Sequence, residues 1–187
     1  MCNIRFSIFT LLLIISSNTF SAGYDIKRFD DGSFSFSILG MKLNEGSTLK
    51  RESILFNDKT SPVTLISHSM SVVYKDRGFR FSGKTKINVK KKIQAINIRT
   101  ILFNIFGQHM SNLSNTEAKD FSVGETLVNG KWRASDSDIT ELLTSVTYIA
   151  RVRYEDGTQW VSNRDNLQLA LSSLHLEKKI GEDDEGK

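Results

Sequence analysis

Cysteine is almost absent from this sequence, which excludes disulfide bonds within a folded domain. The single cysteine of the 187-residue chain, Cys2, lies ahead of an apolar run at the N-terminus. A chain of this length does not need cross-links, because domains of about 150 residues bury about 70% of the surface that their unfolded chains expose. We therefore expect one domain that is stabilised by packing alone.

Proline and excess charge are also scarce. The chain has one proline and a formal net charge of +4, an excess too small to indicate nucleic-acid binding. The low proline content, together with frequent Lys, Asn and Ile, is typical of a bacterial protein.

Motifs of catalysis and cofactor binding are missing as well. The sequence has no Gly-x-Ser-x-Gly turn, no phosphate-binding glycine loop and no His-Glu-x-x-His spacing. Its three histidines, His68, His109 and His175, are far apart in the chain. We therefore predict no catalytic residue, no metal ligand and no cofactor, and the sequence leans against an enzyme.

The N-terminus has the three zones of a secretory signal peptide. Arg5 is its only charged residue, residues 6–15 are apolar, and residues 16–22 are short and polar. About 20 apolar residues are needed to span a bilayer, so the run is too short for a transmembrane anchor. We expect cleavage of a signal peptide (1–22) after Ser21 or Ala22, and a mature protein that is periplasmic or secreted.

The middle of the chain shows the alternation of β-strands. Thr85, Ile87 and Val89 share one predicted face, with Lys84 and Lys86 on the other. The stretch 93–106 is apolar on both faces near its end, which is typical of a central strand. The polar stretch 107–120 indicates a loop. In 146–154, alternation places Val146, Tyr148, Ala150, Val152 and Tyr154 on one face, and Thr147, Ile149, Arg151 and Arg153 on the other.

The C-terminal part changes to helical spacing. Leu167, Ala170, Leu171 and Leu174 recur every three or four residues, which predicts an amphipathic helix within 163–180. Either Ser162 or Asn163 is a suitable N-cap, and Lys178-Lys179 suits the negative end of the helix. The charged segment 181–187 predicts a disordered acidic tail.

These patterns predict a mainly β protein. An N-terminal strand segment (23–52) precedes about seven or eight short strands in 53–162, as in an immunoglobulin-like antiparallel β-sandwich with a C-terminal amphipathic helix. A closed barrel is the alternative.

Two groups of side chains are candidates for binding. Lys84, Lys86, Lys90, Lys91 and Lys92 crowd one hairpin region and would suit an anionic partner. Lysines on exposed strands also protect sheets against aggregation, and that alternative stays open. Trp132 and Trp160 end predicted strands and would form either an aromatic surface or part of the core.

One hairpin resembles a known family. The stretch VTYIARVRY, followed by Asp156-Gly157-Thr158-Gln159-Trp160, resembles the final hairpin of small bacterial exported β-sandwich domains of the FxLyD type. Ala95 and Leu102-Phe103-Asn104 are similar to the central strand of those domains. The resemblance covers 93–160 and implies an immunoglobulin-like fold outside the cytoplasm, with no catalytic or ligand residues.

The sequence therefore predicts an exported, non-enzymatic binding or accessory protein of the bacterial cell envelope. Its expected partner is an envelope or extracellular protein, or an anionic surface component, and not a nucleic acid. Two alternatives are an extracytoplasmic hydrolase with a site not visible in the sequence, and a secreted host-directed factor. The oligomeric state is not indicated.

Overall fold

The computed structural model describes residues 23–30, 35–38, 41–42, 51–75, 78–135, 139 and 141–178. The predicted signal peptide (1–22) and acidic tail (181–187) lie outside these residues. Among the described residues, no helix has the length and apolar character that crossing a membrane requires.

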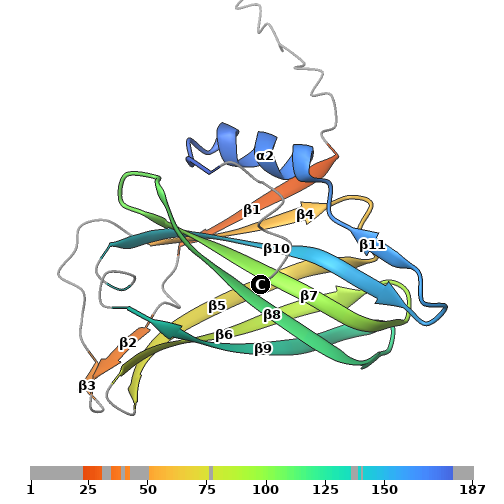
Figure 1. The fold of residues 1–187 in the computed structure, drawn as a ribbon, viewed down its shortest axis with the longest axis horizontal. Coiled ribbons are helices and arrows are strands. Elements are labelled where there is room, and N and C mark those ends of the chain that lie inside the picture. The colour runs from red at the N-terminus through yellow and green to blue at the C-terminus, as the bar shows by residue number, and fades with distance from the viewer. Residues whose placement is uncertain are drawn as a thin grey trace, which may run out of the picture.

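Two β-sheets and one helix form the described fold, which is mainly β (Figure 1). The first sheet has the strand order β1-β4-β10-β7-β8, and β11 also pairs with β10. The second sheet has the order β3-β2-β5-β6-β9. The elements are β1 (Tyr24–Asp30), β2 (Ser35–Ile38), β3 (Met41–Lys42), β4 (Glu52–Asp58), β5 (Val63–Lys75), β6 (Gly78–Val89), β7 (Ile93–Asn104), β8 (His109–Phe121), β9 (Gly124–Ala134), β10 (Leu142–Tyr154), β11 (Gln159–Val161) and α2 (Arg164–Ser173).

The two sheets pack face to face over a core of inward-facing apolar side chains. On β6, Thr85, Ile87 and Val89 are buried and Lys84 is exposed, which confirms the predicted alternation. Two clusters fill the space between the sheets, one around Ile87 and Ile96 and the other around Phe81 and Leu102. Most of the buried apolar side chains therefore lie between the two sheets.

A third cluster lies on the outer face of the first sheet, where α2 packs (Figure 1). Leu167, Ala170 and Leu171 are buried against β4, β7 and β10, as the helical spacing predicted. The Asn163 side chain caps the helix by accepting a hydrogen bond from the Asn166 N–H at 3.0 Å. The helix ends at Ser173, so Lys178 lies beyond its last turn.

Strand β7 is central in the first sheet, between β10 and β8, as its two apolar faces predicted. Ile101 and Phe103 face the helix, whereas Leu102 faces the second sheet. The first sheet is therefore covered on both faces at this end of β7.

The predicted loop 107–120 is wrong, because His109–Phe121 forms strand β8. Leu113 and Phe121 are its only buried residues, since β8 lies at the edge of the sheet and has one face exposed to solvent. A strand in that position needs few apolar side chains, so its polar composition resembles that of a loop.

Not all strand pairings are antiparallel. Among the described strands, β4 pairs with β10 and β2 pairs with β5 in parallel, and the other pairings are antiparallel. After β4 the chain crosses at Ser61-Pro62 to the second sheet, where it forms β5. No hairpin therefore joins β4 to its parallel neighbour β10, since a hairpin joins antiparallel strands.

Candidate functional site

The structure separates the five candidate lysines into two groups. Lys84 and Lys86 project from β6 in the second sheet, and the Lys86 Nζ lies 2.5 Å from a carboxylate oxygen of Glu125. Lys90, Lys91 and Lys92 instead form the connection from β6 to β7. Lys90 lies four positions along the chain from Lys86, which corresponds to about 13 Å of extended strand.

The second lysine group lies beside acidic and aromatic residues. Lys90 Nζ donates to the Ser61 carbonyl oxygen at 3.2 Å, and Lys91 Nζ lies 4.6 Å from the centre of the Tyr154 ring. The three lysines share a shallow pocket with Glu155 and Asp156. The positive charge at this end of the molecule is therefore partly compensated.

The two tryptophans are not brought together, because they pack against different core clusters. The Trp132 ring lies against Gly83 and Gly130, and its Nε1 donates to the Ser114 carbonyl oxygen at 2.8 Å. Trp160 packs against the other inter-sheet cluster, and its Nε1 donates to Thr60 Oγ1 at 3.0 Å. Each indole joins separate segments of the chain, which suits a packing role.

The histidines also lie in separate environments. His68 is buried between the sheets, where its Nδ1 lies 2.9 Å from Thr85 Oγ1 and its Nε2 has no hydrogen-bond partner among the described residues. Burial lowers the pKa of His68 to about 4, which keeps the ring neutral at pH 7. His109 begins β8, and His175 follows α2. The part of the chain that the structure describes contains no group of three metal-binding side chains.

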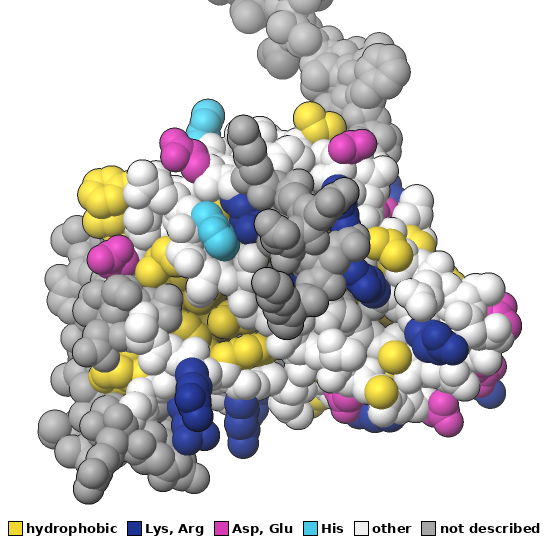
Figure 2. Space-filling model, viewed as in Figure 1, with side chains coloured by type: hydrophobic (Ala, Val, Ile, Leu, Met, Phe, Trp, Pro, Cys, Tyr) yellow, Lys and Arg dark blue, Asp and Glu magenta, His cyan; other side chains and the backbone are white. Residues whose placement is uncertain are grey.

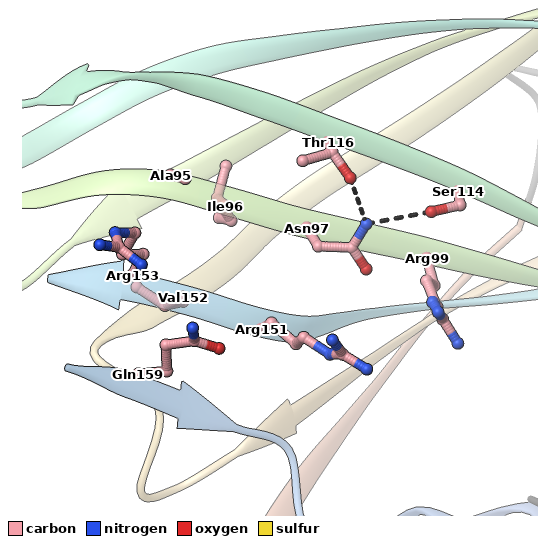
Figure 3. Close-up of a pocket in the computed structure, with 10 residues that line it drawn as sticks. All are labelled: Ala95, Ile96, Asn97, Arg99, Ser114, Thr116, Arg151, Val152, Arg153 and Gln159. Atoms are coloured by element: carbon pink, nitrogen blue, oxygen red, sulfur yellow. Dashed lines mark hydrogen bonds between the residues drawn. The ribbon is translucent and has the colours of Figure 1, made fainter. Parts of the chain in front are cut away.

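A polar groove of about 400 Å³ lies on the first sheet beyond the area that α2 covers. Four strands supply its lining, β7, β8, β10 and β11, as the close-up in Figure 3 shows. Its polar lining residues are Asn97, Arg99, Ser114, Thr116, Arg151, Arg153 and Gln159. We call this site the arginine groove.

A β-bulge in β10 places two of the three arginines in the groove. Ile149 pairs with Ile98 and Arg151 pairs with Asn97, so Ala150 is the extra residue. Because of this insertion, Arg151 and Arg153 share the outer face with Ala150. The uninterrupted alternation predicted for 146–154 is therefore wrong beyond Ala150, and Val152 faces the core.

Two polar atoms at the groove are buried without a partner among the described residues. Asn97 donates through Nδ2 to Ser114 Oγ at 3.0 Å and to Thr116 Oγ1 at 2.7 Å, whereas its Oδ1 accepts no hydrogen bond. Arg99 is only 9% exposed, and its Nε likewise lacks an acceptor. An unsatisfied buried donor on a charged group costs free energy, which a ligand oxygen would recover.

The electrostatics of the groove favour an anion. Its described lining includes three arginines and no Asp or Glu. In Figure 3, the guanidinium of Arg151 lies between the amide of Gln159 and the guanidinium of Arg99. On the face of the molecule in Figure 2, Asp and Glu side chains lie near the outline, and several Lys and Arg side chains lie nearer the middle. Carboxylate and phosphate groups fit such a set of planar donors.

The residues of this groove are far apart in the sequence. Arg151 and Arg153 were visible as neighbours on one strand, but Arg99 lies about 50 positions away in an apolar segment. Only the pairing of β7 with β10 brings them together. Arg99 is the only charged residue in the stretch 93–106, and this is the one signal of the groove in the sequence.

Comparison with known proteins gives no relative from which to transfer a function. The sequence matches no protein-family model, and neither a characterised protein nor a solved structure is significantly similar to the chain.

Proposed function

We propose that this chain is an exported, non-enzymatic binding protein of the bacterial envelope, which holds an anionic group of its partner in the arginine groove. The observation that carries the proposal is Arg99, a buried cation whose Nε has no acceptor among the described residues. Burying a charged side chain with an unsatisfied donor costs free energy, and buried arginines usually have an acceptor for each buried N–H.

The chemistry of the groove supports binding rather than catalysis. Arginine stays protonated at any physiological pH, so the three guanidinium groups donate hydrogen bonds but supply no general base. Asn97, Gln159 and the two hydroxyl residues add neutral donors and acceptors beside the charges. We infer a partner that presents carboxylate or phosphate oxygens along an extended segment.

Removing the three guanidinium charges is expected to weaken anion binding at least about 100-fold, because each charge-assisted hydrogen bond contributes roughly 1.5–3 kcal/mol. The test compares the wild type with Arg99→Gln/Arg151→Gln/Arg153→Gln by fluorescence anisotropy. Labelled hexaglutamate serves as the carboxylate probe and labelled polyphosphate as the phosphate probe. Preference for one probe identifies the chemistry of the partner.

The matched control is Lys84→Gln/Lys86→Gln/Lys92→Gln, which removes the same net charge from outside the groove. Its affinity should fall less than about threefold, since charges beyond a Debye length of about 10 Å are screened at 0.1 M salt. Loss of binding in this control, with retention in the arginine variant, would assign the anion site to the lysines. The double variant Arg151→Gln/Arg153→Gln keeps the buried Arg99. It therefore separates a loss of binding from a folding defect caused by replacing Arg99.

Export remains part of the proposal and has its own test. We expect the protein from an envelope or culture fraction to begin at Ala22 or Gly23, which intact mass spectrometry would detect. A full-length mass with Met1 retained would contradict the signal peptide.

We also propose that the two sheets form an immunoglobulin-like β-sandwich. The three-strand group β5-β6-β9 and the four-strand group β8-β7-β10-β11 support this assignment. So do the connections, because β6–β7, β8–β9 and β9–β10 cross between the sheets while β5–β6, β7–β8 and β10–β11 are neighbours within one sheet. Strands β1 and β4 would then be additions beside β10.

A further inference from the structure

The last described residues lie on the same face as the arginine groove. Leu176 packs in the cluster beneath α2, on the outer face of the first sheet. The Glu177 N–H donates to the Gly107 carbonyl oxygen at 2.8 Å, and Gln168 Nε2 donates to the Lys178 carbonyl oxygen at 2.9 Å. Lys178 Nζ lies 3.5 Å from His109 Nε2, so the described chain ends beside the start of β8.

The distance from this point to the groove matches the length of chain that follows. Ser114 and Thr116 lie five and seven residues along β8 from His109, which corresponds to about 17–23 Å. Glu182 and Glu185 lie four and seven residues beyond Lys178. In an extended chain these positions lie about 13–25 Å from Lys178.

The charges are complementary. The sequence from position 182 is Glu-Asp-Asp-Glu, four consecutive carboxylates. The groove offers three guanidinium groups and has no acidic residue in its described lining. Arginine and carboxylate form bidentate hydrogen bonds, and the buried Nε of Arg99 needs an acceptor.

We propose that the acidic segment Glu182-Asp183-Asp184-Glu185 of this chain binds in the arginine groove and competes there with the anionic partner. This inference rests on the proposed function, since the same arginines hold either ligand. A segment tethered by a short linker has an effective concentration of the order of 1 mM. An external anion must displace the tail before it binds. The tail therefore lowers the apparent affinity for every anion, and partners of higher charge density compete with it best.

The first test neutralises the tail within the full chain, as Glu182→Gln/Asp183→Asn/Asp184→Asn/Glu185→Gln. We expect this variant to bind labelled hexaglutamate about tenfold more tightly than the wild type. The control Asp120→Asn/Glu125→Gln/Glu141→Gln/Glu155→Gln changes the net charge equally at exposed positions. It should gain less than about threefold.

The second test observes the tail directly, without an external ligand. Since Cys2 is the only cysteine of the chain and lies in the proposed signal peptide, a Gly186→Cys variant of the chain from Gly23 onward carries one nitroxide label. Paramagnetic relaxation should weaken the backbone amide signals of Asn97, Arg99 and Arg151. The weakening should disappear in the Arg99→Gln/Arg151→Gln/Arg153→Gln background.

The outcomes separate this inference from the proposed function. Weakened groove signals together with tighter hexaglutamate binding support it. If hexaglutamate binds through the arginines but the label leaves the groove signals unchanged, the tail inference is overturned and the proposed function stands. If the label weakens those signals while neither probe binds any variant, the tail docks and the proposed function fails. An equal gain in the control variant also overturns the inference.

Discussion

Acidifying the protein from pH 7 to pH 4 is expected to lower its free energy of unfolding by about 3 kcal/mol through His68 alone. Burial lowers the pKa of this histidine from 6.5 to about 4. Between these two values, the unfolded chain binds a proton that the folded protein does not. Stability from this group is therefore complete above pH 6.5 and is lost as the pH falls toward 4.

Urea unfolding at pH 7 and pH 4 measures the change in the free energy of unfolding. The His68→Gln variant separates the contribution of His68 from that of carboxylates that titrate over the same pH range. Glutamine is similar in size and retains a polar atom for Thr85, but it takes up no proton. The variant should lose about 3 kcal/mol less than the wild type over the same pH change. The exposed His175→Gln variant is the matched control, and it should behave as the wild type does. Equal pH dependence in His68→Gln and the wild type would refute the prediction.

Replacing Trp132 with alanine should destabilise the protein by about 3 kcal/mol, at the lower end of the range for a buried tryptophan because this ring is only partly buried. The indole covers Gly83 and Gly130, where no side chain can fill the space that it leaves. For a protein of this size, the melting temperature should fall by about 6–12 °C.

Trp132 also supports the arginine groove from behind. Its Nε1 holds the Ser114 carbonyl oxygen, and the Ser114 hydroxyl accepts a hydrogen bond from Asn97 in the groove. Trp132→Phe keeps a ring over the two glycines but loses this donor, so it should retain most of the stability and lower hexaglutamate affinity by a few fold. A Trp132→Ala protein that melts as the wild type does would exclude the packing role.

Local patterns in the sequence predicted much of this fold. The alternation on β6 and the apolar spacing of α2 were correct, because each element buries one face and its periodicity records which one. Strand β8 was missed because it is an edge strand that buries few side chains. The parallel pairing of β4 with β10 was also missed, since no local pattern records which strand lies beside another.

The candidate site could not be predicted from the sequence for a similar reason. The lysines stood out because they are neighbours in the chain, and the structure leaves them in two groups. The groove needs Arg99 and Arg151 on adjacent strands, and this depends on long-range register. It also needs the bulge at Ala150, which reversed the predicted orientation of Arg151 and Arg153.

The bulge at Ala150 also constrains how this protein can change during evolution. Point substitutions at Arg151 or Arg153 would alter the charge of the groove and leave the strand in register. Deletion of Ala150 would remove the bulge and still leave Arg151 opposite Asn97, with both arginines on the outer face. Restoring simple alternation at constant length would instead pair Ala150 with Asn97 and direct both arginines toward the apolar core. Such a chain would bury two charges and lose the inward position of Val152. Lineages of this protein should therefore vary the ligand by substitution, and should lose the bulge only together with one residue of β10.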